Sequence, residues 1–393
     1  MSPDVIVVGG GIAGCACADR LAARGLDVLL LERGALASGA TGRNQGGLLP
    51  SPVPACGSLY AEAVAYYRQV EAEGDVPFRL REHGYLLVAQ DEEGLDRARS
   101  HGRALTEGGF PSTAISTREL LELEPGLAPD LAGAVAVQGA HALHPVLAAA
   151  ALAARARRAG AVIRTNTPVR GLLRRGEQVT GVITDDGALS AGAVVLAAGP
   201  WSRSLAHQAG SDLPVFGARG WLVRTAPVTS AVFRHTLMQS TWHGSGGLQK
   251  QGLPLLTEVA GAAPGAGTRV VFSLQPLPGG DVVLGSSSGP ALQLDDAQDG
   301  ERTAALIVAA AARHAPALAK ASVRETWAGV RPMSPDGLPV VGPAPGAPGL
   351  WFLSGYGIDG MPLAPGTSRL LADYLINGQC PPQAAAFSPD RFG

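Results

Sequence analysis

The sequence predicts an α/β fold in which a discontinuous domain with a parallel sheet carries an inserted domain with a mixed or antiparallel β-sheet. Three observations predict it. A buried strand, a glycine-rich turn, a helix and a second buried strand open the chain over residues 5–31. Apolar strands and helices of the same kind return in the middle and at the end of the chain. From about Phe216, by contrast, strand-like segments alternate with turns and helices are sparse.

The opening unit makes the first domain Rossmann-like. Val5–Val8 is a short continuous apolar run, as in a strand buried on both faces of a parallel sheet. Six residues of glycine-rich turn follow, and Cys15–Arg24 then carries apolar residues at helical spacing until a glycine ends the helix. Val28–Leu31 is the second buried strand and is followed by Glu32. Strand, helix and strand in this order form one βαβ unit.

The remaining helices are predicted from apolar residues at helical spacing, and the remaining strands from short apolar or alternating runs. Residues 38–49 are polar and rich in glycine, and we expect them to form a loop. Helices are expected at Leu59–Glu73, Gly94–Glu107, His144–Ala159, Ala297–His314 and Ala364–Ile376. Strands are expected at Gly84–Ala89, Val162–Thr165, Val169–Arg174, Val179–Thr184, Ala193–Ala198, Trp221–Thr225, Arg269–Leu274, Asp281–Gly285 and Leu350–Ser354.

Composition and charge narrow the class of protein. Of 393 residues, 46% are hydrophobic and 16% are charged, so the chain has enough apolar material for a core and is not intrinsically disordered. The net charge of −2 gives no basic excess for nucleic acid or an anionic membrane. The four cysteines are scattered and form no CxxC pair, so we expect neither a disulfide scaffold nor a metal site.

The ends and the longest uncharged stretches bear on location. The N-terminus has no basic segment of the kind that begins a secretory signal. Uncharged stretches such as Gly337–Ile358 are interrupted by proline and glycine, and so do not predict a transmembrane helix. We therefore expect a cytoplasmic protein.

The glycine-rich turn has the setting of a dinucleotide-binding motif. Gly9, Gly11 and Gly14 match GxGxxG, with a strand before, a helix after and an acid at the end of the next strand. Gly9 would make the tight turn, Gly11 would let the backbone approach a pyrophosphate, and Gly14 would let the helix pack on the sheet. Glu32 would accept hydrogen bonds from a ribose and would disfavour the 2′-phosphate of NADP. The motif leaves NAD and FAD open.

Further segments carry a resemblance to a known family. Residues 37–48, ASGATGRNQGGL, offer many backbone N–H groups and little bulk, which suits a flat ring and a diphosphate. WAGVRPMSPDG and GYGIDGMPLAP lie near the end of the chain. With GGGIAG, HPVLAAAALAARARRAGA and VVLAAGPWS, these motifs resemble the FAD-dependent D-amino-acid oxidase family over essentially the whole chain. That family includes glycine oxidase, sarcosine oxidase, D-amino-acid dehydrogenase and the flavin subunits of opine, hydroxyproline and glycine dehydrogenases.

The resemblance implies two domains. Residues 1–80, 142–215 and 325–393 are expected to form the FAD-binding domain. Residues 81–141 and 216–324 are expected to form the substrate-binding domain, which covers the flavin.

The resemblance also implies how FAD is held. Glu32 and Arg33 are expected at the adenosine ribose, and Val169 at the adenine through its backbone. Gly199 and Trp201 are expected beside the pyrophosphate. Residues 355–362 would place backbone N–H groups, and the positive end of the next helix, near the flavin N1 and O2, which gain negative charge on reduction. The expected cofactor-binding residues are Gly9, Gly11, Ile12, Ala13, Gly14, Glu32, Arg33, Thr41, Gly42, Arg43, Asn44, Gln45, Gly46, Gly47, Val169, Gly199, Trp201, Arg331, Gly357, Ile358, Gly360 and Met361.

Attachment of the flavin is expected to be noncovalent. Family members that attach flavin through histidine carry that histidine where this chain has Asn44. No cysteine lies near the motifs that face the ring.

Arg331, Tyr356 and Asp359 are the expected catalytic residues. Arg331 matches the arginine that binds the substrate carboxylate in glycine oxidase and D-amino-acid oxidase, and a guanidinium is planar, charged and bidentate. The alternative for Arg331 is a salt bridge to a loop acid such as Asp336. Asp359 either binds a substrate ammonium or a second basic group, or caps the next helix. Ile358 stands where glycine oxidase has an arginine, which puts a glycine-sized substrate in doubt.

Further candidates that would cover the flavin come from the substrate-binding domain. Packing in the core or in a loop is the favoured interpretation for the first two of them, and no motif supports an oxygen-steering role for the lysine. These candidates are Trp242, His243, Gln249 and Lys250.

The implied activity is oxidation of the CH–NH bond of a small amino acid or secondary amine to an imine, by hydride transfer to flavin N5. No side-chain base at the carbon is required, because the protein orients the substrate, excludes water and stabilises the reduced ring. The electrons pass to O2 or to an electron-accepting partner. The alternative is therefore the flavin subunit of a multi-subunit dehydrogenase, and either a homo- or a hetero-oligomer is compatible with the sequence. A flavin-binding protein without turnover is a third possibility, which the presence of Arg331 disfavours.

Overall fold

The computed structural model describes residues 2–229, 231–240, 268–291, 293–296 and 300–393, and its first large sheet has the strand order β19-β20-β13-β1-β2-β9. Within it only β19 runs antiparallel to its neighbour. The strands are β1 (Val5–Val8), β2 (Val28–Leu31), β9 (Val162–Arg164), β13 (Ala193–Leu196), β19 (Val340–Pro343) and β20 (Leu350–Ser354).

Both faces of this sheet are covered. Val5 and Val7 of β1 belong to a core shared with helices on one face, and Ile6 and Val8 belong to a core on the other face. A strand covered on both faces needs no polar alternation, which is why its sequence is a continuous apolar run. The helices on the first face are α1 (Ile12–Ala22), α2 (Pro54–Glu73), α5 (Pro145–Arg158) and α10 (Gly360–Asn377). The second face packs on α6 (Ser202–Gln208) and on the antiparallel sheet of β10 (Val169–Arg175), β11 (Gln178–Thr184) and β12 (Gly187–Ser190).

The second large sheet is mixed and has the order β18-β14-β17-β16-β15-β5-β7-β6. All of its pairs are antiparallel except β15 with β5. Its strands are β5 (Tyr85–Ala89), β6 (Ser112–Ile115), β7 (Gly133–Val137), β14 (Phe216–Thr225), β15 (Thr236–Gln239), β16 (Arg269–Pro276), β17 (Val282–Pro290) and β18 (Val323–Met333). Helices pack on it as α3 (Glu92–Glu107), α4 (Thr117–Leu123) and α9 (Gly300–His314).

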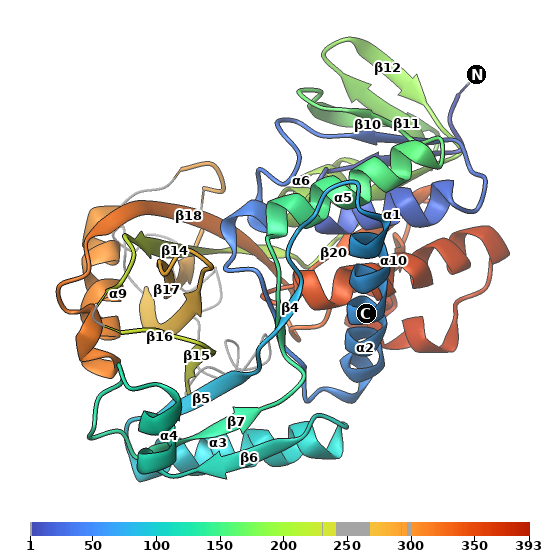
Figure 1. The fold of residues 1–393 in the computed structure, drawn as a ribbon. Helices are drawn as coiled ribbons and strands as arrows, with labels where there is room; N and C mark the ends of the chain where they lie inside the picture. Colours follow the sequence, from blue (N-terminus) through green and yellow to red (C-terminus); the bar gives the residue numbers. More distant parts are fainter. Residues whose placement is uncertain (1, 230, 241–267, 292, 297–299) are drawn as a thin grey trace.

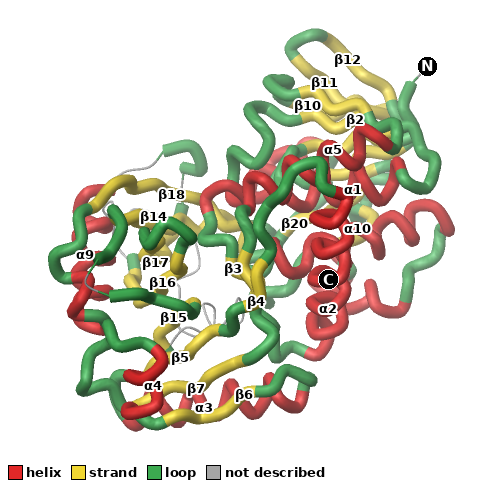
Figure 2. The backbone as a smooth tube through the Cα atoms, in the orientation of Figure 1, coloured by secondary structure: helices red, strands yellow, loops and turns green. Residues whose placement is uncertain are grey.

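The chain passes between the two sheets more than once, and Figure 1 shows the two sheets with their helices side by side. Strands of the parallel sheet come from residues 5–31, 162–196 and 340–354, and the mixed sheet is built from residues 85–137 and 216–333 between them. The predicted fold class, a discontinuous Rossmann-like domain with an inserted mixed sheet, is therefore confirmed. A small sheet of β3 (Gly47–Leu48), β8 (His141–Ala142) and β4 (Arg81–Glu82) lies where the two parts meet (Figure 2).

Several predicted element ends were wrong, for reasons of local chemistry. α2 begins at Pro54 rather than at Leu59, because proline in the first turn lacks only an N–H that has no partner there. α10 begins at Gly360 rather than Ala364, with Pro362 in its first turn for the same reason. Several short elements were not predicted, among them α4, β6, β7 and β12.

Two further observations concern the whole chain. Among the described residues, no helix combines the length and the apolar character that crossing a membrane requires. Cys15, Cys17 and Cys56 are buried free thiols, and burial raises the pKa of each to about 12. Cys380 is exposed.

Candidate active site

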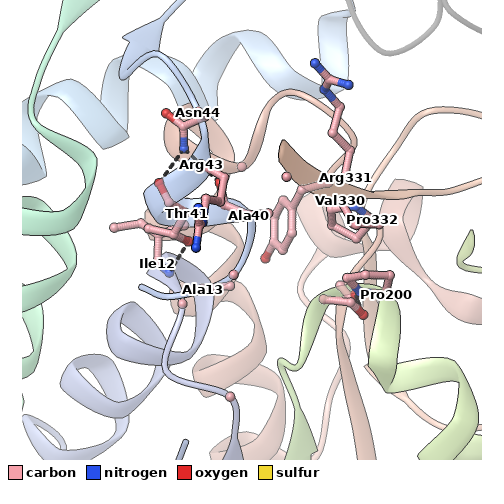
Figure 3. Close-up of a pocket in the computed structure, with 18 of the residues that line it drawn as sticks. Ile12, Ala13, Ala40, Thr41, Arg43, Asn44, Pro200, Val330, Arg331 and Pro332 are labelled. Atoms are coloured by element: carbon pink, nitrogen blue, oxygen red, sulfur yellow. Dashed lines mark hydrogen bonds between the residues drawn. The ribbon is translucent and has the colours of Figure 1, made fainter. Parts of the chain in front are cut away.

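A cavity of about 490 Å³ lies between the carboxyl ends of the parallel strands and one face of the mixed sheet. Figure 3 shows Ile12, Ala13 and Thr41 on one side of it and Arg331 and Pro332 on the other. Open α/β sheets bind their ligands at this strand edge. Two sheets that are distant along the chain thus share one site.

The turn before α1 borders the cavity with backbone rather than side chains. Gly9 has a φ of +112°, and a Cβ at Gly14 would lie 1.9 Å from the Gly9 carbonyl oxygen, so α1 packs directly on the turn. Gly11, Ile12 and Ala13 line the cavity. The Ile12 N–H donates to Thr41 Oγ1 at 2.9 Å, which satisfies one of the free donors at the start of the helix. The positive end of α1 therefore faces the site.

Glu32 is fixed at the end of β2. Its Oε2 accepts from the Gly10 N–H at 2.6 Å and its Oε1 accepts from the Gly34 N–H at 2.9 Å. The side chain is 9% exposed and lines the cavity. The carboxylate thus keeps one orientation, next to the turn that precedes α1.

Arg33 and Trp201 line the cavity and contact an acid from the inserted domain, Asp295. The Arg33 guanidinium lies 4.0 Å from the centre of the Trp201 ring and 2.9 Å from Asp295 Oδ1. Trp201 Nε1 donates to Asp295 Oδ2 at 3.3 Å. Asp295 was not predicted, because nothing in the local sequence marks its partner.

The loop after β2 is held by its own side chains. Asn44 Nδ2 donates to the Thr41 carbonyl at 2.7 Å, and Asn44 Oδ1 accepts from the Gly46 N–H at 2.7 Å. Gln45 reaches the mixed sheet, where it donates to the Val283 carbonyl at 3.1 Å and accepts from the Ser273 hydroxyl at 3.2 Å. The loop that the sequence predicted at the flavin therefore joins the two sheets.

Tyr356 and Asp359 lie at the start of α10. The buried Tyr356 hydroxyl is 2.7 Å from Thr367 Oγ1, which donates in turn to the Leu363 carbonyl. The Tyr356 hydroxyl is thus engaged with the helix, and burial raises its pKa. Asp359 occupies the N-cap position of α10, but its side chain makes no capping hydrogen bond. Both residues line the cavity.

Arg331 projects from β18 over the cavity face of the mixed sheet. Its Nη1 donates to the Ser287 carbonyl at 3.1 Å. Burial lowers the pKa of Arg331 to about 10, so the guanidinium stays charged at neutral pH. Asp336, the acid that the sequence offered as an alternative partner, instead pairs with Arg391 at 2.7 Å. Among the described residues, Arg331 has no carboxylate partner.

The mixed sheet contributes cavity residues that were not predicted from the sequence. In β15 and β16, Leu237, Phe272 and Leu274 face the core beneath α9, and the residues between them face the cavity. The alternation Phe272-Ser273-Leu274-Gln275 was a usable signal of a half-buried strand, but it does not show what the polar face meets. The missed residues of the mixed sheet are Gly220, Leu222, Thr236, Met238, Ser273, Gln275, Ser286, Gly329, Val330 and Pro332.

Most residues predicted to bind the cofactor line this cavity. Gly14, Gly42 and Gly46 are not part of the lining that the described residues form. A Cβ at each would lie 1.9, 2.4 and 2.1 Å from a backbone carbonyl oxygen, so these glycines permit close packing behind the site. Trp242, His243, Gln249 and Lys250 lie outside the described residues. The predicted residues in the lining are Gly9, Gly11, Ile12, Ala13, Glu32, Arg33, Thr41, Arg43, Asn44, Gln45, Gly47, Val169, Gly199, Trp201, Arg331, Tyr356, Gly357, Ile358, Asp359, Gly360 and Met361.

Known proteins share this arrangement. The model of the FAD dependent oxidoreductase family matches residues 4–374. Glycine oxidase of Pseudomonas aeruginosa is 32% identical over 398 residues, which are 97% of this chain and 96% of the relative. The crystal structure of glycine oxidase from Geobacillus kaustophilus is similar with a TM-score of 0.82 at 27% identity, covering 98% of each chain.

Part of the chain is also similar to a relative that is named for glycerol 3-phosphate rather than for an amino acid. One of the subunits of the anaerobic glycerol-3-phosphate dehydrogenase of Escherichia coli is 36% identical over 234 residues, which are 56% of this chain and 42% of the relative. The family match spans nearly the whole chain and includes every segment that lines the cavity. The chain therefore belongs to the family of FAD-dependent oxidoreductases that includes the amino-acid oxidases and dehydrogenases, and it is an FAD-dependent enzyme.

Proposed function

We propose that this enzyme binds FAD noncovalently and oxidises the CH–NH bond of a small amino acid or secondary amine to an imine. The observation that carries the proposal is that one cavity is lined both by the turn before α1 and by Arg331. The first suits a dinucleotide and the second suits a carboxylate.

The residues of the cavity fit FAD. Gly11 lines the cavity at the start of α1 without a side chain, so a pyrophosphate can approach the backbone there. Glu32 supplies a fixed acceptor for a ribose. Gly357 and Gly360 border the cavity at the start of α10, whose positive end favours negative charge on a reduced ring. Bound there, FAD supplies the hydride acceptor of the reaction.

The contacts of Asn44 support noncovalent binding. Both ends of its amide hydrogen-bond to the loop backbone, and asparagine has no nucleophilic side chain of the kind through which histidine attaches flavin. We expect acid precipitation of the purified yellow protein to release all of the flavin into the supernatant. Colour that stays in the pellet after washing would show a covalent bond and refute this part of the proposal.

The charges of the cavity support a substrate with a carboxylate and an amine. Arg331 binds the carboxylate and so fixes the distance of the neighbouring carbon from the flavin. Asp359 adds an acid to the lining of the same cavity, and it would hold a cationic substrate group until that group loses its proton. The amine must be unprotonated when the hydride leaves, because its lone pair forms the imine.

A panel of D-amino acids, N-methyl amino acids, prolines and opines, mixed with the enzyme without oxygen, tests the activity. Bleaching of the flavin by one class identifies the substrate, and failure of every amine to bleach it would refute the proposal. Oxygen uptake by the isolated chain would indicate an oxidase. Turnover with artificial acceptors alone would indicate a dehydrogenase subunit that passes electrons to a partner. The relative from the anaerobic glycerol-3-phosphate dehydrogenase, which is itself named as a subunit, supports keeping this alternative.

Substitution of Arg331 tests the assignment of the carboxylate site. We expect Arg331→Ala to raise KM for the best carboxylate substrate by about 100-fold, the equivalent of a charge-assisted hydrogen bond of about 3 kcal/mol. The Kd for FAD should change by less than about threefold. Equal losses of substrate and FAD affinity would reassign Arg331 to the cofactor or the fold.

The division into an FAD-binding domain (1–80, 142–215 and 325–393) and a substrate-binding domain (81–141 and 216–324) is part of the same proposal. The membership of the strands in the two large sheets supports it. β18 crosses the boundary at residue 325 and remains in the mixed sheet to Met333, so Arg331 belongs to the sheet of the substrate-binding domain. A cytoplasmic location and the oligomeric state stay predictions.

A further inference from the structure

The guanidinium of Arg331 contacts two strands other than its own, β14 at Gly220 and β17 at Ser287. We call these two residues the Arg331 seat. A Cβ placed on Gly220 of β14 would be 2.2 Å from Arg331 Nη1, 2.5 Å from Nη2 and 2.6 Å from Cζ. No side chain larger than hydrogen therefore fits at position 220 while Arg331 stays where it is. Gly220 lines the cavity, as Arg331 does, so both lie on the same face of the sheet.

The far side of the seat is an irregularity in β17. β14 pairs with β17 at Arg219↔Gly289 and again at Val223↔Leu284, with a shift of one residue between the two pairs. Such a bulge takes backbone groups out of the ladder and re-aims neighbouring side chains. Here the Trp221 N–H donates to the Ser287 hydroxyl at 2.9 Å, and the Ser287 carbonyl accepts from Arg331 Nη1 at 3.1 Å.

Within the part of the chain that the structure describes, these contacts leave the other donors of Arg331 for a ligand. Nη1 of the guanidinium donates to the Ser287 carbonyl, and no described carboxylate forms an ion pair with the guanidinium. A guanidinium held at one edge by a carbonyl and supported from below by a glycine keeps its plane fixed, which bidentate binding of a carboxylate requires. An arginine on a flexible stem would otherwise lose rotamer freedom on binding.

We propose that Gly220 and Ser287 are positioning residues that hold Arg331 for the substrate carboxylate. The inference rests on the proposed function, since it takes Arg331 as the carboxylate ligand. The inference goes beyond the proposed function because it assigns the orientation of Arg331, and so the preference for a carboxylate, to Gly220 on β14 and to the bulge in β17. The backbone of Gly220 does not have a positive φ, so alanine is tolerated by the main chain and the clash falls on the flexible end of Arg331.

Binding of propionate, a carboxylate without an oxidisable amine, tests the seat in the FAD-loaded enzyme. Its Kd is measured from the change in the flavin absorbance spectrum, with uncharged propionamide as the matched probe. We expect Gly220→Ala to raise the Kd of propionate at least tenfold, to leave that of propionamide within about twofold, and to leave the Kd of FAD unchanged. KM for the best substrate should rise more than kcat falls.

A double-mutant cycle separates action through Arg331 from a direct clash of the new methyl group with the ligand. In an Arg331→Ala background, Gly220→Ala should change the propionate Kd by less than twofold. A further tenfold loss there would overturn the inference, as would an unchanged Kd in Gly220→Ala alone. Ser287→Ala, which removes the hydroxyl that accepts from the Trp221 N–H, is the second variant in case Gly220→Ala does not fold. It should raise the Kd of propionate about threefold or more. If Arg331→Ala itself leaves propionate binding intact, the proposed function of Arg331 has failed instead.

Discussion

At the scale of single residues, part of the cavity wall contributed by the mixed sheet is polar, and its side chains hydrogen-bond to one another. Thr236 Oγ1 lies 2.7 Å from Gln275 Oε1 and 2.7 Å from His83 Nε2. Thr236 and Gln275 line the cavity, while His83 lies behind them. Burial lowers the pKa of His83 to about 4, so the ring is neutral at pH 7. The network therefore fixes the wall without adding charge.

The depressed pKa of His83 predicts a loss of stability on acidification. The unfolded chain takes up a proton at this histidine near pH 6.5, whereas the folded chain does so only near pH 4, so stability falls as pH falls between these values. The free energy of unfolding in urea should fall less between pH 7 and pH 5 for His83→Gln than for the unchanged protein, by about 1–2 kcal/mol. An identical fall in both proteins would show that His83 does not contribute.

At the scale of elements, the close packing of α1 on its preceding turn shapes one side of the cavity. Gly14 is the third glycine of the motif, and the space it leaves belongs to the carbonyl of Gly9 rather than to a ligand. The loop after β2 is also held by a local contact, since both ends of the Asn44 amide hydrogen-bond to the loop backbone. The motif glycines therefore have two tasks: Gly9 and Gly11 border the cavity, and Gly14 lets backbone segments touch.

Substitution of Gly14 tests the packing task. A Cβ there would lie 1.9 Å from backbone, which cannot move aside as a side chain can. We expect Gly14→Ala to cost about 2–3 kcal/mol in the free energy of unfolding and to weaken FAD binding as α1 shifts.

Gly57 in α2 offers the matched control, because a Cβ there meets its nearest atom only at 4.0 Å. Gly57→Ala should stabilise the protein by about 1 kcal/mol or less, through helix propensity. If the two substitutions have equal effects on urea unfolding, the packing role of Gly14 is wrong.

At the scale of the whole molecule, three contacts join the parallel and the mixed parts around the site. Gln45 links the loop after β2 to β16 and β17. Trp327 of β18 donates from Nε1 to the Arg43 carbonyl at 3.3 Å. Arg33 and Trp201 meet Asp295, which follows β17. The position of one sheet relative to the other therefore sets the dimensions of the site.

Loss of the contact with Asp295 should speed the release of FAD. Asp295→Asn removes the charge that holds Arg33 over Trp201, at the end of the cavity expected to hold the adenosine. Since the pair is exposed, we expect a rise of about two- to fivefold in the dissociation rate of FAD, smaller at high salt. Flavin fluorescence after dilution measures the rate. Asp96→Asn, which breaks the exposed pair with Arg99 on α3, should leave it unchanged.

Local signals in the sequence were enough for the fold class and the βαβ unit, and most residues that the family resemblance offered for the cofactor line the cavity. A continuous apolar run reports a strand covered on both faces, and glycines at fixed spacing report a turn at a helix start. The partners across the site, by contrast, came only from the packing of the two sheets. Gly220, Ser287 and Asp295 contact Arg331 and Arg33 over long separations in the chain, and no local periodicity encodes such a pairing. The hydrogen bond between the Tyr356 hydroxyl and Thr367 also depends on packing. A buried hydroxyl needs a partner, and here the folded helix α10 supplies it.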